Sequence, residues 1–292
     1  MKTIAFAGLG AMGLPMAKNL LARGHRVRGI DLNPAALDAL TAAGGERAPD
    51  AAAAATGADV LVLMVINAAQ AEQVLFADGA LHALNERAIV CLMATCPPGA
   101  VERIAARVAA AGRRFVDAPV SGGTAGASAA SLTIMAACER ATFDELQPVF
   151  QAIGQRLFHV GEQPGQGATV KTVNQLLCGV HIAVVAEAFA LAAKVGVDLE
   201  VLLEIMGGSA ASSWMLKDRG PRMLQAEPEV SSAVDIFVKD LGIVMEAGRE
   251  AKAALPIAAV AHQMFVAASG RGDGRADDSQ VIRGYYALNG VR

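Results

Sequence analysis

Short apolar runs alternate with longer amphipathic segments over about the first 160 residues of the chain. The runs have the length and composition of buried strands, and the segments between most of them have helical spacing. Strands are predicted at Thr3–Ala7, Arg26–Asp31, Asp59–Val65, Ala88–Met93, Arg114–Ala118, Ser131–Ala137 and Arg156–Val160. Helices are predicted at Leu14–Ala22, Pro34–Ala43, Ala69–Leu75, Pro98–Ala111 and Thr142–Ile153. This alternation is typical of a mostly parallel, doubly wound α/β sheet.

The pattern changes at a polar joint rich in glycine and proline, Glu162–Gly167. No convincing strand follows it. Further helices are predicted at Thr169–Val195, Leu199–Met206, Met215–Leu224, Val238–Ala253 and Ile257–Ala268. We therefore expect a doubly wound α/β domain over residues 1–162. An all-α domain over residues 163–292 would open with a long interdomain helix.

Composition narrows the range of partners. The formal net charge is −3, and no basic patch is evident, so neither nucleic acid nor an acidic membrane surface is an expected partner. The first apolar run is interrupted by glycines and Pro15, which disfavours a signal peptide. The apolar stretch 168–195 contains charged and amide side chains and is predicted to be a buried helix, not a membrane span.

The cysteines give no sign of a metal or disulfide framework. They are Cys91, Cys96, Cys138 and Cys178, and they form no C-x-x-C pair. This spacing is typical of reduced, mostly buried thiols in a cytoplasmic protein. No metal site is expected.

The first strand runs directly into a G-x-G-x-x-G turn, which consists of Gly8, Leu9, Gly10, Ala11, Met12 and Gly13. Glycines allow the backbone to approach a pyrophosphate, and the following helix offers free N–H donors at its N-terminus. The second strand ends in Asp31, whose carboxylate suits the ribose hydroxyls of NAD and would repel the 2′-phosphate of NADP. The segment predicts a dinucleotide site that prefers NAD.

Two further turns follow the third and fourth strands. Met64 and Val65 begin one, and Thr95 lies in the other. Ligands of doubly wound sheets bind outside the carboxyl ends of the strands, so both turns are predicted to face the cofactor. An ordinary helix cap before Pro97 is an equally good interpretation of Thr95 from spacing alone.

Ser121, Gly122 and Gly123 leave the fifth strand. Successive backbone N–H groups in such a turn form a nest that binds a carboxylate, and the missing side chains allow close approach. A flexible loop is the alternative interpretation.

Lys171 and Asn174 lie three residues apart near the start of the long predicted helix, so they share a face. A lysine acts as an acid–base group when burial or a nearby positive charge lowers its pKa. Val170, Val173, Leu176 and Leu177 indicate a buried helix, against the alternative of a surface lysine. Further along, Phe237 and Lys239 lie at the entry of a predicted helix, and pattern alone suggests an exposed Lys–Asp pair there.

Together these segments resemble the β-hydroxyacid dehydrogenase family, whose members include 3-hydroxyisobutyrate dehydrogenase and tartronate semialdehyde reductase. The resemblance rests on Gly8–Leu20 with Gly24–His25, on Asp117–Gly123, on Gly165–Asn174 and on Lys239–Leu241. The four segments follow the family's order along nearly the whole chain. Ala94 stands where the family usually has serine, which removes a hydroxyl near the cofactor but leaves Thr95.

The resemblance implies a Rossmann-type NAD(P)-dependent oxidoreductase that acts on CH–OH groups and assembles as a homodimer or homotetramer through its helical domain. It implies that Lys171 accepts the hydroxyl proton and that Asn174 orients the substrate. Other implied substrate contacts are Ser121, Gly122, Gly123 and Phe237, and further cofactor contacts are Thr95 and Lys239.

Within the family, three stretches resemble the members that oxidise L-threonate, a four-carbon sugar acid, at C2. They are Val65–Gln70, Val173–Ile182, and Ser212–Met215 with Ser232–Gly242. The expected reaction is NAD-dependent oxidation of a small hydroxy acid such as L-threonate to 2-dehydro-erythronate. The alternatives are 3-hydroxyisobutyrate dehydrogenase or an NADPH-dependent tartronate semialdehyde reductase. Imine reductases and non-catalytic nucleotide-sensing modules of this fold usually lack a lysine at position 171.

Overall fold

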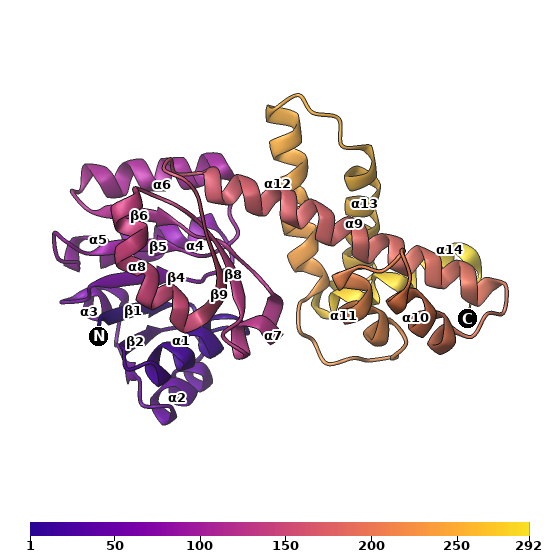
Figure 1. Ribbon diagram of the computed structural model, residues 1–292, viewed down its shortest axis with the longest axis horizontal. Coiled ribbons are helices and arrows are strands. Elements are labelled where there is room, and N and C mark those ends of the chain that lie inside the picture. The colour runs from indigo at the N-terminus through magenta and orange to yellow at the C-terminus, as the bar shows by residue number, and fades with distance from the viewer. Residues whose placement is uncertain (292) are drawn as a thin grey trace. The chain divides into compact units, whose positions relative to one another are not determined.

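A computed structural model describes residues 1–291 of the chain (Figure 1). Its internal contacts divide the chain into two units, Met1–Lys171 and Thr172–Arg292. The first unit is an α/β domain and the second is helical, which confirms the predicted fold class. The domain boundary after residue 162 stays a prediction.

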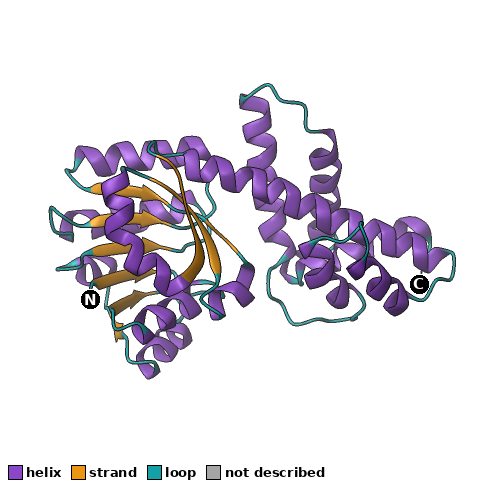
Figure 2. Cartoon of the chain, in the orientation of Figure 1, coloured by secondary structure: helices purple, strands orange, loops and turns teal. Residues whose placement is uncertain are grey.

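The first unit contains one nine-stranded sheet with the order β3-β2-β1-β4-β5-β6-β8-β7, in which β9 pairs with β8 (Figure 2). The strands are β1 (Thr3–Ala7), β2 (Arg26–Ile30), β3 (Glu46–Arg47), β4 (Val60–Leu63), β5 (Ile89–Leu92), β6 (Arg114–Asp117), β7 (Val120–Ser121), β8 (Leu132–Ala137) and β9 (Gly154–Gly161). Pairing is parallel except where β8 meets β6 and β7.

Helices pack on both faces of this sheet. They are α1 (Gly13–Ala22), α2 (Pro34–Ala42), α3 (Ala51–Ala55), α4 (Ala68–Glu72), the π-helical η1 (Gln73–Ala77), α5 (Ala80–Ala83), α6 (Pro98–Ala110), α7 (Gly123–Ser128) and α8 (Arg140–Ile153). Successive residues of β1 point to opposite faces, so Ile4 and Phe6 join one apolar core while Ala5 and Ala7 join the other. A sheet buried on both faces explains why its strands are continuous apolar runs.

The strand order reverses beside β1. The chain passes from β1 to β2 and β3 on one side, then returns to β4 on the other. Ligands of open α/β sheets bind outside the carboxyl ends of the strands at such a reversal. This topology brings the turns that follow β1, β2 and β4 to one edge of the sheet.

The second unit is built from helices around its own core. They are α9 (Gln166–Lys194), which begins in the first unit, α10 (Leu199–Gly208), α11 (Trp214–Met223), α12 (Val234–Glu250), α13 (Pro256–Gly270), the short η2 (Asp273–Arg275) and η3 (Asp278–Val281), and α14 (Ile282–Asn289). Within residues 1–291 no strand follows β9, although Ala233 and Asp277 form an isolated bridge.

Helix α9 differs from its predicted burial. Val170, Val173 and Leu177 are exposed, so the interpretation of these three residues as signs of a buried helix is wrong. The fourth residue of that prediction, Leu176, is half-buried and packs against the core of the helical unit. Lys171 beside Val170 is nevertheless buried, at 7% exposure. Among the described residues α9 is also the one helix long and apolar enough to cross a membrane, with 44% of its most apolar window buried.

Candidate active site

The glycine-rich turn connects β1 to α1 and lies against the start of the next turn. Gly8 has a φ of +93°, and a Cβ at this position would lie 2.5 Å from the carbonyl oxygen of Met64. Its N–H donates to the carbonyl of Ile30 at 3.0 Å. Only glycine therefore fits where three strand ends converge.

The other two glycines of the motif have different surroundings. A Cβ on Gly13 would lie 1.8 Å from the carbonyl oxygen of Gly8, so this position is closed by the packing of helix on strand. A Cβ on Gly10 would meet no atom within 4 Å. Gly8 and Gly13 are thus closely packed against the protein, whereas Gly10 leaves open space beside the turn. A pyrophosphate needs such open space at the N-terminus of α1.

Asp31 is held by the same turn. Its Oδ2 accepts a hydrogen bond from the N–H of Leu9 at 2.5 Å, and its Oδ1 accepts one from the N–H of Asn33 at 2.7 Å. The carboxylate is therefore fixed at the carboxyl end of β2 beside the predicted dinucleotide position. A negative charge there fits the ribose hydroxyls of NAD.

Met64, Val65 and Thr95 lie at the same edge of the sheet. The N–H of Met64 donates to Ala7 at 2.8 Å, which joins the turn after β4 to the end of β1. Thr95 follows β5, but α6 has Pro97 at its N-cap position and no side-chain cap. Thr95 is therefore not the N-cap residue of that helix, and its predicted cofactor contact stays a prediction.

Ser121, Gly122 and Gly123 connect β7 to α7, two short elements that the sequence analysis did not predict. Gly122 and Gly123 have φ values of +130° and +61°. These conformations turn the chain sharply from strand to helix. The segment therefore forms a turn between a strand and a helix, and its predicted contact with the substrate carboxylate stays a prediction.

A buried carboxylate holds the start of α9. Asp117, the last residue of β6, is 1% exposed, and its Oδ2 accepts hydrogen bonds from the N–H groups of Gly165 at 3.0 Å and Ala168 at 2.9 Å. Burial raises the pKa of Asp117 to about 6, against the opposing effect of these N–H donors. Gly167 packs tightly here too, since a Cβ on it would lie 2.7 Å from the carbonyl oxygen of Asp117. Lys171 follows one turn later on the helix so anchored.

Residues of the second unit carry the remaining predicted contacts. Helix α12 begins at Val234, four residues before the predicted start, so Lys239 lies inside it and not at its entry. The side chain of Lys239 is 25% exposed, and its Nζ lies 2.7 Å from Oδ1 of Asp240, which is 3% exposed. The prediction of an exposed Lys–Asp pair is wrong, because one face of the helix turns the carboxylate into the unit.

Phe237 also belongs to this helix. Its ring is buried and stacks on Phe265, with the ring centroids 5.2 Å apart. The contact gives Phe237 a packing role in the core of the helical unit. Its predicted contribution to the substrate pocket stays a prediction.

Three residues without a predicted role make buried polar contacts: Asp117 in the first unit, and Gln175 and Asp240 in the second. Each is a polar residue next to apolar ones, and a carboxylate directly after a buried strand is the one signal that the sequence offered for Asp117. Nothing in the sequence pairs Gln175 with Asp240, because the two lie 65 residues apart.

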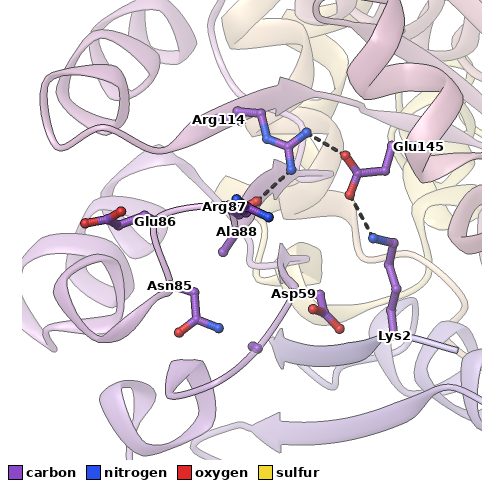
Figure 3. Close-up of a pocket in the computed structure, with 9 residues that line it drawn as sticks. Lys2, Asp59, Asn85, Glu86, Arg87, Ala88, Arg114 and Glu145 are labelled. Atoms are coloured by element: carbon purple, nitrogen blue, oxygen red, sulfur yellow. Dashed lines mark hydrogen bonds and ion pairs between the residues drawn. The ribbon is translucent and has the colours of Figure 1, made fainter.

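A hollow at the opposite edge of the sheet has a different character. Lys2, Asp59, Ala88 and Arg114 lie there at or just before the amino ends of β1, β4, β5 and β6 (Figure 3). Glu145 binds Arg114 at 2.6 Å and Lys2 at 2.8 Å, and these hydrogen bonds lower its pKa to about 2. Opposite charges neutralise each other here, so the hollow offers no net charge to a dinucleotide.

Comparisons with known proteins agree with this geometry. A family model described as the NAD binding domain of 6-phosphogluconate dehydrogenase matches residues 3–161. A second, described as "NAD-binding of NADP-dependent 3-hydroxyisobutyrate dehydrogenase", matches residues 165–285.

Individual relatives match over nearly the whole chain. L-threonate dehydrogenase of Cupriavidus necator is 42% identical over 283 residues, which cover 97% of this chain and 95% of that protein. L-threonate dehydrogenase of Escherichia coli K12 is 39% identical, with coverage of 96% and 93%. A crystal structure of 3-hydroxyisobutyrate dehydrogenase from Salmonella typhimurium has a TM-score of 0.91 and 40% identity, and it covers 96% of this chain and 98% of its own.

The chain therefore belongs to the β-hydroxyacid dehydrogenase family. It is an NAD-binding hydroxyacid oxidoreductase, as the sequence predicted.

Proposed function

We propose that the chain catalyses the NAD-dependent oxidation of L-threonate at C2 to 2-dehydro-erythronate. The similarity to L-threonate dehydrogenases over 97% of the chain supports the substrate. The observation that carries the reaction is a buried lysine, Lys171, on a helix whose first turn is anchored by Asp117. A buried amine is easier to deprotonate than an exposed one, and a neutral amine is what a proton acceptor requires.

In this proposal different residues of the first unit bind the cofactor, bind the substrate carboxylate and accept the proton. When bound, NAD would supply the acceptor for the hydride of C2. Gly8–Gly13, Asp31, Met64, Val65 and Thr95 hold the dinucleotide along the carboxyl edge of the sheet. The backbone N–H groups of Ser121, Gly122 and Gly123 bind the substrate carboxylate. Nζ of Lys171 takes the proton of the C2 hydroxyl, so charge does not accumulate on the oxygen as the carbonyl forms.

The second unit supplies orientation. Asn174 holds the substrate, Phe237 bounds its pocket, and Lys239 contacts the cofactor. We place the domain boundary after residue 162, in the joint before α9. The apolar residues exposed along α9 suit contact with a second copy of the chain, so we propose a homodimer or homotetramer. Cys91, Cys96, Cys138 and Cys178 form no disulfide among the described residues, which agrees with a cytoplasmic location.

Two other substrates have specific support. The crystal structure at 40% identity is of a 3-hydroxyisobutyrate dehydrogenase. An NAD-dependent L-serine dehydrogenase of Pseudomonas aeruginosa is 35% identical over 91% of this chain. Each of these acids has a carboxylate and a nearby hydroxyl, so the same nest and lysine would serve them.

A matrix of cofactors and substrates tests the proposal. Turnover would be measured with NAD and NADP on L-threonate, glycerate, 3-hydroxyisobutyrate and L-serine, and with NADH and NADPH on tartronate semialdehyde. The expected result is the highest kcat/KM for L-threonate with NAD. A higher value for another acid would replace the substrate, and preference for NADP would contradict the role of Asp31.

The role of Lys171 has its own test. Lys171→Met keeps an unbranched side chain of nearly the same length but removes the amine, and we expect kcat to fall about 10²–10⁴-fold. Circular dichroism and NAD binding would show that the variant is folded. Near-normal turnover by a folded variant would exclude Lys171 as the proton acceptor.

A further inference from the structure

A buried polar contact joins α9 to α12 within the helical unit. Gln175 is 7% exposed and Asp240 is 3% exposed, and Nε2 of Gln175 donates a short hydrogen bond to Oδ2 of Asp240. The helices approach closely at this point, since a Cβ on Gly179 would lie 2.8 Å from a methyl carbon of Leu241. A charge at such an interface is costly unless other groups compensate it.

The contact extends in both directions to residues of the proposed site. Oε1 of Gln175 accepts a hydrogen bond from Nδ2 of Asn174 at 2.9 Å. On the other side, Nζ of Lys239 lies 2.7 Å from Oδ1 of Asp240. This carboxylate oxygen is buried without a directed hydrogen bond among the described groups, so the lysine acts as its counter-ion. One chain of contacts therefore runs from Asn174 to Lys239.

The chemistry of the Asp240 carboxylate determines the donor and acceptor at each hydrogen bond in this series of contacts. An ionised carboxylate only accepts hydrogen bonds, so Asp240 draws the NH₂ group of Gln175 toward itself. The carbonyl end of the Gln175 amide then faces Asn174 and accepts from its NH₂ group. Asp240 thereby determines which end of each amide points where, and a buried network of this kind is more rigid than its separate bonds.

We propose that Asp240 is a positioning residue that, through Gln175, sets the orientation of the Asn174 amide and, through its ion pair, the position of Lys239. The inference rests on the proposed roles of Asn174 at the substrate and Lys239 at the cofactor. One buried carboxylate then aligns the two ligands with each other. Small misplacement of reacting groups lowers rates steeply, so this alignment affects turnover without Asp240 touching either ligand.

Two variants separate the contact that leads from Asp240 to Asn174 from the contact that leads from Asp240 to Lys239. Asp240→Asn removes the charge that holds Lys239 and lets the Gln175 amide reverse. Gln175→Met keeps a similar volume but cuts only the branch to Asn174. The measurements are KM and kcat for L-threonate and, independently of turnover, the Kd of NAD by titration. Asp278→Asn is the matched control, because Asp278 is a buried carboxylate of the same unit whose partner is Arg219 at 2.8 Å.

We expect kcat/KM for L-threonate to fall about 10–100-fold in both variants. The Kd of NAD should rise about tenfold in Asp240→Asn and stay within about twofold in Gln175→Met. Asp278→Asn should lower the Tm but leave KM, kcat and Kd within about twofold. If Asp240→Asn and Gln175→Met lower only the Tm, as the control does, the proposal is overturned and the contact between Gln175 and Asp240 is purely structural.

The experiment also distinguishes failure of the proposed function from failure of the positioning role of Asp240. If the native chain does not turn over L-threonate, the same ratios are measured on the best acid of the substrate matrix, and the NAD titration needs no substrate at all. If Asp240→Asn does not fold, the split between unchanged NAD binding and reduced kcat/KM in Gln175→Met decides the matter. An unchanged kcat/KM in that variant would overturn the inference.

Discussion

The three glycines of the first turn differ in what a methyl group would encounter. Gly10 faces open space, whereas a Cβ on Gly13 would lie 1.8 Å from a backbone oxygen. We expect Gly10→Ala to fold with native stability but to bind NAD at least about tenfold more weakly, since the methyl group would occupy the approach of the pyrophosphate.

Gly13→Ala is the informative counterpart. The added methyl group should displace the backbone and so lower the free energy of unfolding, whether or not NAD is bound. Thermal unfolding and NAD titration of the two variants give the comparison. Tight NAD binding by Gly10→Ala would show that the pyrophosphate does not approach this turn.

Asp117 gives a prediction for pH. Burial raises its pKa in the folded chain from 3.8 to about 6. Because the folded state favours the protonated form, the stabilisation by this group is complete below about pH 4 and is lost as pH rises through about 6. Asp117→Asn imitates the protonated carboxyl and keeps an acceptor for Gly165 and Ala168.

Urea unfolding of the native chain and Asp117→Asn at pH 4 and pH 7 measures this effect. The variant should gain stability relative to the native chain on going to pH 7, by up to about 3 kcal/mol. The native chain and the variant share all other titrating groups, so the contributions of those groups to the pH dependence of stability cancel in the difference. An equal difference at both pH values would mean that Asp117 does not titrate in this window.

Single residues also mark the limit of sequence reasoning. The glycine turn, Asp31 and the first strand are local signals, and the structure places them as predicted. The burial of Asp240 depends on where α12 begins and on Gln175, far away in the sequence, so a local Lys–Asp pattern indicated an exposed pair. Side chains whose surroundings come from distant segments are the ones that the pattern could not predict.

Among the elements, the apolar strands and long helices were predictable and the short ones were not. The elements β3, β7 and α7 span too few residues for a period to show. The two strands among them, β3 and β7, form where neighbouring strands supply their hydrogen bonds. Helix α14 was missed as well, although it packs into the core of the helical unit through Ile282 and Tyr285. Tertiary context, not intrinsic preference, determines such elements.

A buried ion pair connects α11 to η3. Arg219 binds Asp278 through two nitrogens, at 2.9 and 2.8 Å, and both side chains are buried. Arg219→Met should destabilise the helical unit by about 3–5 kcal/mol, because it leaves a buried charge without a partner.

Removal of both charges should recover most of this loss. Arg219→Met with Asp278→Leu leaves an apolar contact in place of the ion pair, and such replacements are often neutral. Chemical denaturation of the single and double variants measures the difference. Equal instability of both would mean that shape, and not the unpaired charge, dominates the effect.

At the scale of the whole molecule, an apolar stripe along α9 defines the expected contact between copies. Val173, Leu177, Val184 and Leu191 are 50–62% exposed and recur at intervals of four and seven residues. This spacing places them on one helical face, as in helices that pair with another helix.

Charge on this stripe should separate the copies. Leu177→Glu with Leu191→Glu is expected to shift the mass measured by light scattering from that of an oligomer to that of one chain. Phe158→Glu, at another exposed apolar residue but in the first unit, should leave the mass unchanged. An unchanged mass for the double variant would locate the contact elsewhere.

The hydrogen bond from Leu9 to Asp31 has a consequence for how cofactor preference could change during evolution. The carboxylate that would discriminate between the two dinucleotides also closes the turn that holds them. A replacement that removes the charge together with the acceptor, such as Asp31→Ala, would weaken the turn and the binding of both dinucleotides. A viable route to NADP would pass through asparagine, which keeps the acceptor, before any basic residue arrives. Selectivity and architecture are inherited together at this position.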